Sequence, residues 1–285
     1  MKNIKYLLFS ACVTCALMSC EKHDLSFAPQ ESADGMALFQ ITYVEPIAVN
    51  ANNAIDSVYL NGALVAGATG VGQLAVNGTY PYGPSTGTGL FFATKPGYNN
   101  IKFYRKGNEV YNQDINLTAG RQEVFVFSLS EVPVILDNDY PHKYNPERAT
   151  PATFNTDSIA RIRFYNFAFQ GNASTPYVGK IQYQWCHDST VGSTGRGGPD
   201  GNWHNIGGYV GFGEATTYEI VGVYKETFNS GGQEQLWFRG IDETGKVVIA
   251  DDYWTTMLGV AVKHIYRGIV GGTPKAGITL SGALR

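Results

Sequence analysis

The chain has 285 residues, of which 44% are hydrophobic and 13% aromatic, but only 16% are charged, against about 25% in ordinary globular proteins. This composition excludes disordered, coiled-coil and collagen-like chains, and the length favours about two domains, each large enough to bury its own core. The formal net charge is −3 and no run of Lys or Arg occurs, so we expect no nucleic-acid partner.

The first twenty residues have the pattern of a bacterial export signal. Lys2 and Lys5 form a positive segment, and the apolar stretch 6–17 is too short to cross a bilayer as a mature helix. The stretch ends in Leu17-Met18-Ser19-Cys20, which resembles the lipobox of bacterial lipoproteins: an aliphatic residue, two tolerant positions with a small residue last, then cysteine. The resemblance implies that residues 1–19 are a signal peptide cleaved before Cys20, and that Cys20 carries acyl chains such as palmitate.

The partner implied by this anchor is outer-membrane lipid. Several acyl chains would hold the protein firmly in the membrane, whereas a single chain binds only marginally. Residues 20–35 are short of large apolar side chains and are predicted to form a tether. Glu21-Lys22-His23-Asp24 partly matches the acidic surface-export signal of some Gram-negative lipoproteins, so we expect the cell surface, and an orientation toward the periplasm stays open. The alternative to lipidation is an ordinary signal peptide with a chance cysteine.

From residue 36 the chain alternates apolar and polar residues with period two, as in 37–43, which is typical of half-buried β-strands. Asn61-Gly62 is a strong hairpin signal, and Lys106-Gly107-Asn108 predicts another turn. Residues 36–136 are therefore predicted to form a β-sandwich of six to eight strands. No stretch sustains a 3.6-residue period, so helices should be few and short.

A repeat links the two halves of the chain. At an offset of 123 residues, apolar positions match in the following pairs: Ala37 and Ala160, Phe39 and Ile162, Ile41 and Phe164, Val58 and Ile181, and Leu60 and Tyr183. With insertions, 101–103 corresponds to 236–238, and 124–127 to the 261–266 region. Residues 137–155 contain three prolines and are predicted to be a linker, which leaves 156–285 as a second sandwich with its own independent core.

This tandem arrangement is similar to the family called domain of unknown function 4397. The motifs that carry the similarity are an opening strand such as 160–166, a second strand ending as in 57–62, closing strands after 118–121, and the 266–271 segment. The resemblance implies immunoglobulin-like sandwiches on an exported protein, with no catalytic residues to transfer. The predicted fold is therefore all-β, with two tandem immunoglobulin-like antiparallel β-sandwich domains.

Enzymatic and metal chemistry find little support in the residues. Cys186-His187-Asp188-Ser189 contains the residue types of a nucleophilic site, but neighbours on a strand point to opposite faces and do not converge. His264 lies in an apolar strand, and His142 and His204 have no second His at ligand spacing. Acidic turn residues complete no calcium loop. We expect no catalytic activity, no metal and no cofactor.

The best candidate for a ligand contact is Trp203. All four tryptophans lie in the second half, and Trp203 follows a Gly-rich segment and is flanked by Asn202, His204 and Asn205. An aromatic ring with polar neighbours is suited to stacking on sugar rings and binding their hydroxyls. The alternative is a tryptophan that fixes a long loop to the sandwich.

Two classes of function remain. The first is a lipid-anchored binding or adhesion protein that recognises a glycan or a protein through loops of the second domain. The second is a structural subunit of a surface assembly, similar to a fimbrillin. Such subunits need a basic cleavage site near the mature N-terminus, whereas the first Arg after Cys20 is Arg105, and Lys22 is the only basic residue of the tether at which a trypsin-like protease could cut. The sequence therefore favours the binding protein.

Overall fold

The period-two alternation does form β-sandwiches in the computed structural model, which describes residues 35–67, 74, 76, 79–80, 91–138, 159–171, 175–190, 197–222, 233–257, 261–271 and 278–281. Within these ranges the fold is all-β, and the only helical segment is a single 3-10 turn, Ala51–Asn53. The predicted signal peptide, Cys20 and nearly all of the tether lie outside the described residues. Among the residues described, no helix is long and apolar enough to span a membrane.

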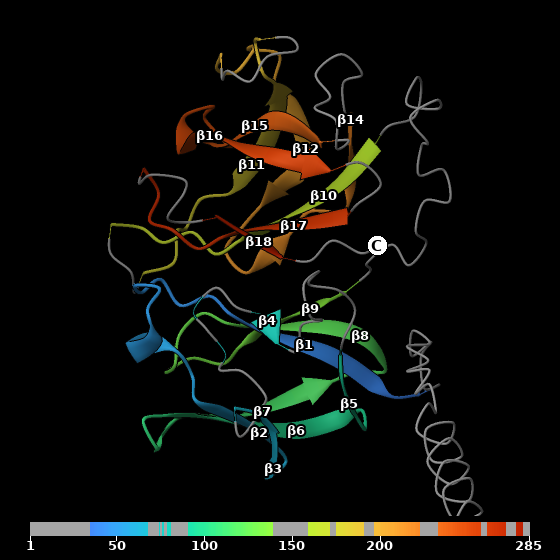
Figure 1. Cartoon of the computed structure of the whole chain (residues 1–285), viewed down its shortest axis with the longest axis vertical. Helices are drawn as coiled ribbons and strands as arrows, with labels where there is room; N and C mark the ends of the chain where they lie inside the picture. The colour runs from blue at the N-terminus through green and yellow to red at the C-terminus, as the bar shows by residue number, and fades with distance from the viewer. Residues whose placement is uncertain are drawn as a thin grey trace, which may run out of the picture. The chain divides into compact units, whose positions relative to one another are not determined.

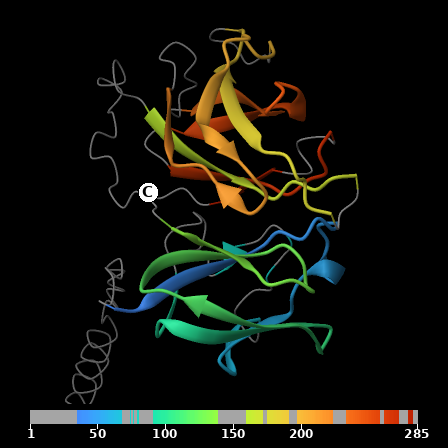
Figure 2. The same cartoon turned by 180° about the vertical axis from the view of Figure 1, so that it is seen from behind.

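The first sandwich is built from nine strands in two sheets (Figures 1 and 2). One sheet has the order β4-β1-β8-β9, with β5 also pairing with β1, and the other has the order β3-β2-β6-β7. The strands are β1 (Ala37–Tyr43), β2 (Ser57–Leu60), β3 (Ala63–Ala66), β4 (Thr79–Tyr80), β5 (Phe92–Thr94), β6 (Gly97–Arg105), β7 (Asn108–Leu117), β8 (Gly120–Val126) and β9 (Val134–Asp137).

The second sandwich repeats this strand order. Its sheets are β13-β10-β17-β18, with β14 also pairing with β10, and β12-β11-β15-β16. The strands are β10 (Ile159–Asn166), β11 (Ile181–His187), β12 (His204–Val210), β13 (Glu214–Ala215), β14 (Glu219–Gly222), β15 (Gln233–Asp242), β16 (Val247–Met257), β17 (Ala261–Tyr266) and β18 (Ile278–Ser281). Strand for strand, this is the arrangement expected of two copies of one fold.

The ladders are mostly antiparallel, but one central pair in each sandwich is parallel. β1 runs parallel to β8, and β10 runs parallel to β17. Parallel neighbours need a long crossover connection. Here the crossover is the rest of the sandwich, because the chain passes through the opposite sheet before its eighth strand returns beside its first.

Two tight hairpins form where the sequence predicts them. Asn61 and Gly62 have φ values of 50° and 81° and join β2 to β3, and Lys106 and Gly107, with φ values of 50° and 76°, join β6 to β7. Positive φ at both central residues is the signature of a type I′ turn, whose twist matches that of the flanking strands.

The inward-facing residues of each sandwich form a core. The repeat positions Ile41 and Phe164 are both fully buried, and the ladders pair them with Val124 and His264 respectively, which makes those two residues equivalent. The match between 101–103 and 236–238 is corrected. Tyr59 pairs with Lys102, whereas its repeat partner Gln182 pairs with Ile241, so the equivalent segment of β15 lies four residues further along.

Each sandwich has an apolar core of its own, and a third apolar cluster lies between them. The interface cluster consists of Val44, Phe125, Tyr165, Phe167 and Ile265, which come from both sandwiches. The rings of Phe125 and Phe167 lie 4.9 Å apart between centroids. Residues 34–285 accordingly form one compact unit.

Polar side chains also cross this interface. The buried Lys263 ammonium pairs with the buried Glu123 carboxylate and donates to Gln40 Oε1 at 3.3 Å. Arg267 Nη1 donates to the carbonyl oxygens of Glu45 and Ile47 at 2.8 and 3.0 Å. A buried charge without a partner is costly, so these contacts tie the two sandwiches to each other.

Candidate functional site

The candidate site lies on the outward face of the sheet β12-β11-β15-β16. Residues of β11 and β15 that alternate with the core positions point away from the core. Figure 2 brings the β11–β12 hairpin to the front of the view. We call this surface the Trp203 face and define it by six residues: Gln184, Trp203, Asn205, Trp237, Arg239 and Tyr253.

Cross-strand register aligns the polar residues of the Trp203 face. Gln184 on β11 pairs with Asn205 on β12 and with Arg239 on β15. Arg239 Nε donates to Gln184 Oε1 at 2.8 Å, and Gln184 Nε2 donates to Asn205 Oδ1 at 2.8 Å. The two bonds form one chain across three strands and fix the orientation of both amides.

Trp203 completes this row from the segment just before β12. The guanidinium carbon of Arg239 lies 4.1 Å from the centre of the Trp203 ring, which is within the range of a cation–π contact. Trp203 and Arg239 are both half-buried, and Asn205 is exposed. The contact with the Trp203 ring and the hydrogen bond to Gln184 together restrain the guanidinium group.

The other two aromatic rings lie next along the sheet. Trp237 pairs with Tyr253 across β15 and β16, and their ring centres are 5.7 Å apart. Trp237 Nε1 donates to Asp188 Oδ2 at 2.8 Å, and Asp188 Oδ1 accepts from Thr190 and from the Gly197 amide. Burial raises the pKa of Asp188, but these hydrogen bonds outweigh it, so the pKa lies below its ordinary value. The ionised Asp188 therefore holds Trp237 in place and binds the backbone at Thr190 and Gly197.

The residues of the 186–189 segment do separate tasks. Cys186 is a free, buried cysteine, and burial raises its pKa to about 11, so its thiol stays protonated at neutral pH. The His187 ring packs edge-on against Trp185 with centroids 5.1 Å apart, while Asp188 binds Trp237. A protonated thiol is a poor nucleophile, so Cys186 is not activated in this arrangement.

The four residues that the sequence predicts as ligand contacts, Asn202, Trp203, His204 and Asn205, fall into two pairs in the structure. Trp203 and Asn205 join Arg239 and Gln184 on the outward face. His204 instead lies against Trp185, with ring centres 4.8 Å apart, and Asn202 donates to Asp200. Trp203 and Asn205 are thus the members of this set that meet other polar residues across the sheet.

Reasoning from the sequence missed Gln184 and Arg239. The signal was present, because Leu236 and Phe238 are core residues and the residues that alternate with them, Trp237 and Arg239, must face outward. That alternation does not reveal which outward residues of separate strands meet. Only the register of β11 against β12 and β15 brings Gln184 between its two neighbours.

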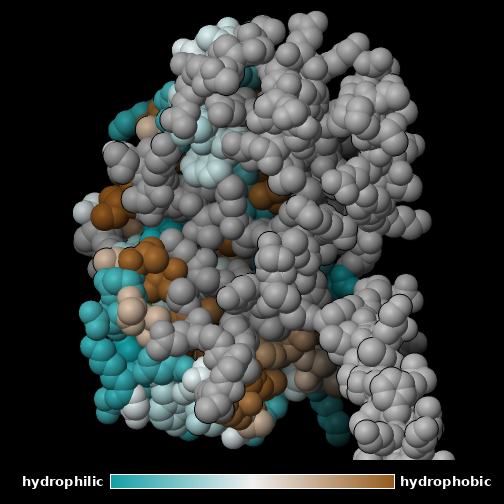
Figure 3. Space-filling view, viewed as in Figure 1, coloured by the Kyte–Doolittle hydropathy of each residue, from teal (hydrophilic) through white to brown (hydrophobic). Residues whose placement is uncertain are grey.

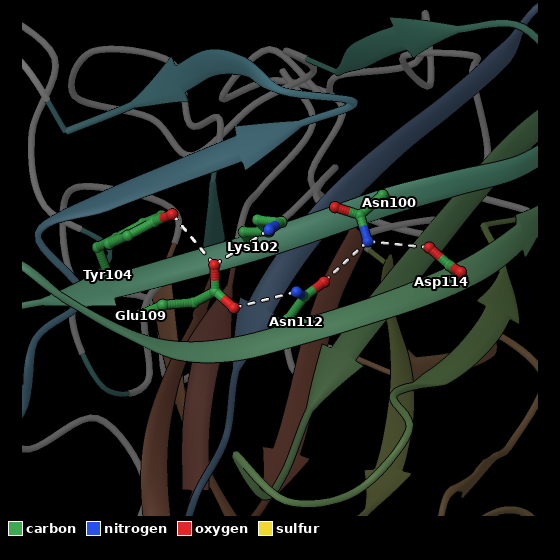
Figure 4. Close-up of polar contacts among 6 residues, drawn as sticks. All are labelled: Asn100, Lys102, Tyr104, Glu109, Asn112 and Asp114. Atoms are coloured by element: carbon green, nitrogen blue, oxygen red, sulfur yellow. Dashed lines mark hydrogen bonds and ion pairs between the residues drawn. The ribbon is translucent and has the colours of Figure 1, made fainter.

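The equivalent surface of the first sandwich is arranged differently. The Glu109 face lies on β6 and β7 (Figure 4) and consists of Asn100, Lys102, Tyr104, Glu109, Asn112 and Asp114. Glu109 accepts from Lys102 at 3.0 Å, from Tyr104 at 3.1 Å and from Asn112 at 3.0 Å. Hydrogen bonds to Lys102, then to Asn112, lower the pKa of Glu109. The region at the lower left of Figure 3, where Figure 1 places the β6–β7 turn, is hydrophilic.

Register places Asn100 where the second sandwich has Arg239. Tyr59 and Gln182 are repeat partners and pair with Lys102 and Ile241, so positions two residues earlier on β6 and β15 also correspond. Asn100 Nδ2 donates to Asn112 and to Asp114, both at 2.9 Å. The donors of the Glu109 face are therefore used within the face.

His264 is a titratable side chain in the core of the second sandwich. His264 Nδ1 and the Tyr183 hydroxyl lie 2.9 Å apart in the second core, and burial lowers the pKa of His264 to about 3. His264 is thus a neutral core residue at physiological pH. Within the described ranges, no group of three or more His, Cys, Asp or Glu side chains is placed to hold a metal ion.

Two comparisons of the sequence with known proteins gave no match. No protein-family model matches the chain, and no curated protein sequence matches it at a significant level. The resemblance to domain of unknown function 4397 therefore stays a prediction.

Proposed function

We propose that this protein is a lipid-anchored binding or adhesion protein of the bacterial cell envelope, exposed at the cell surface, without catalytic activity. Its ligand is a glycan or a host or envelope protein, and the Trp203 face receives it. The observation that carries the proposal is the combination of Trp203, Trp237 and Tyr253 with the hydrogen-bonded row of Arg239, Gln184 and Asn205. Aromatic rings beside oriented polar groups are the composition of sites that bind polar ligands.

The test is a glycan-array and protein-array screen of residues 21–285, repeated with Trp203→Ala. Loss of an aromatic anchor should weaken binding by about 1 to 3 kcal/mol. The melting temperature of the variant is the control, because a drop of several degrees would make Trp203 a packing residue. A wild-type ligand whose affinity is unchanged in the variant would move the site away from this face.

A structural subunit is the second candidate, and one observation favours it. β7 and β16 are ten and eleven residues long and lie at the edges of their sheets. An unpaired edge strand is a template for pairing with another chain. A blank binding screen together with fibres or ordered oligomers in electron microscopy would put this candidate ahead.

The anchor and the location are tested separately. Cys20→Ala should abolish labelling by radioactive palmitate and leave a soluble or uncleaved chain. Protease added to intact cells should digest the wild-type protein if it faces outward. Palmitate labelling that persists in the variant would contradict the lipobox, and protection from protease would place the protein toward the periplasm.

A further inference from the structure

Arg239 is the charged residue of the Trp203 face, and only part of its guanidinium is engaged. Nε donates to Gln184, and the guanidinium carbon lies over the Trp203 ring. Within the described part of the chain, the terminal nitrogens Nη1 and Nη2 form no hydrogen bond or ion pair. Asp251, whose negative charge acts on Arg239, forms no ion pair with it there. A guanidinium fixed at one edge presents its other edge as a fork of donors.

Asn205 adds a further donor to the same row. Because Gln184 Oε1 accepts from Arg239, Gln184 donates through Nε2, and Asn205 accepts with Oδ1. The Asn205 amide nitrogen is then left for solvent or ligand on an exposed side chain. The free polar atoms of the row are therefore donors, and their natural complement is a group that only accepts hydrogen bonds.

We infer that the ligand of the Trp203 face is an acidic glycan, whose sugar carboxylate is bound by the terminal nitrogens of Arg239. This inference rests on the proposed function and specifies its ligand class. A carboxylate matches the guanidinium fork with two parallel hydrogen bonds, which are stronger than neutral ones. The flanking rings Trp203, Trp237 and Tyr253 favour a sugar over an acidic peptide, because a pyranose ring offers a flat C–H face for stacking.

The site is oriented before the ligand arrives. Trp203 and Gln184 already hold the Arg239 plane, so binding does not have to immobilise a long, freely rotating side chain. The equivalent position on the Glu109 face carries Asn100, whose amide nitrogen already donates to Asn112 and Asp114. The inference therefore assigns acidic ligands to the second sandwich and not to the first.

The experiment is calorimetric titration of residues 21–285 with trigalacturonate and 3′-sialyllactose, each compared with a neutral counterpart, trigalacturonate methyl ester and lactose. The acids should bind at least about 10-fold more tightly than their counterparts, as expected for a charge-assisted pair. Arg239→Lys keeps the charge but loses the fork, so it should weaken acid binding by about 10-fold. Lys102→Met removes one positive charge from the Glu109 face and is the matched control that should leave binding unchanged.

Each other outcome overturns the inference in a distinct way. If acid and neutral glycans bind equally, the face binds glycans without reading a carboxylate, and the proposed function survives. If oligoglutamate binds as tightly as trigalacturonate, the face recognises acidic peptides instead. If the arrays find ligands but no acidic glycan among them, the ligand class is wrong, and if they find none, the proposed function fails as well. Should Arg239→Lys not fold, the comparison of acid with ester on the wild-type chain still decides.

Discussion

The two outward faces of this protein lie on equivalent sheets with the same strand order, yet they differ in where their hydrogen-bond donors point. On the Glu109 face, Asn100 donates to Asn112 and Asp114, and Lys102 donates to Glu109. These donors therefore form hydrogen bonds with other residues of the same face. On the Trp203 face, Arg239 occupies the position of Asn100 and keeps its terminal nitrogens free of partners among the described residues. Core residues at equivalent positions of the two sandwiches must stay apolar to keep the fold. Outward residues at equivalent positions are free to differ, so the two copies can differ in function.

The largest effect is expected where the sandwiches are coupled. Lys263→Met leaves the Glu123 carboxylate buried without its partner, and we expect a loss of about 3–5 kcal/mol in the free energy of unfolding. Urea unfolding followed by circular dichroism measures it. The tryptophan fluorescence transition, which reports on the second sandwich alone, should coincide with it in the wild type because the interface cluster joins the cores.

The control for this variant removes both charges. Lys263→Met with Glu123→Leu should recover most of the lost stability, because neither charge is then buried alone. A single variant that is as stable as the wild type would show that the ion pair does not couple the sandwiches. Separate transitions in the wild type would instead confirm the prediction of two independent cores.

The second largest effect is a dependence of stability on pH that arises in the core of the second sandwich and not in that of the first. Burial holds the pKa of His264 at about 3, below the value of about 6.5 for an unfolded histidine, so between these values only the unfolded chain binds the proton. The contribution of the neutral His264 to the free energy of unfolding is therefore fully present above pH 6.5. It falls as the pH drops toward 3, by about 1.4 kcal/mol per pH unit. The first sandwich has Val124 at this position, which does not titrate.

Unfolding measured from pH 7 to pH 4 tests this difference. His264→Val with Tyr183→Phe removes the histidine and the hydroxyl that would otherwise lose its partner, so this part of the pH dependence should disappear. An unchanged slope in the double variant would assign the acid sensitivity to other groups.

The third prediction compares the faces directly. Once a ligand is found, Trp203→Ala should weaken its binding by about 1–3 kcal/mol. Tyr98→Ala is the matched control, because Tyr98 is 86% exposed on the outward side of β6. Equal losses in the two variants would mean that both faces contribute to binding.

The smallest effect is expected on the Glu109 face. Glu109→Gln removes one ion pair between exposed side chains, so the melting temperature should change by less than about 2 °C. The lowered pKa of Glu109 means that its contribution is present at neutral pH and is lost only as the pH falls through that value. A larger change at neutral pH would show that this network also stabilises the fold.

The sequence by itself was sufficient for the class of fold. Period-two alternation predicted strands, Asn61-Gly62 and Lys106-Gly107 predicted two hairpins that form as type I′ turns, and apolar matches such as Ile41 with Phe164 predicted the repeat. These features are local, because each depends on a residue and its near neighbours. The alternation also carried a limit: a shift of four residues preserves it, which is why 236–238 was matched to 101–103 when the ladders place the equivalence further along β15.

Only the tertiary structure decided which distant residues meet. Nothing local indicates that Glu123 and Lys263 would be buried together, or that Phe125 would pack on Phe167 and join the two cores. Likewise, Trp203 could be singled out by its polar neighbours, but its partner Arg239 lies on another strand, and Gln184 links Arg239 to Asn205 only through the register of three strands. Sequence patterns report which side of a strand a residue faces, whereas contacts between strands depend on pairing and packing across the whole chain.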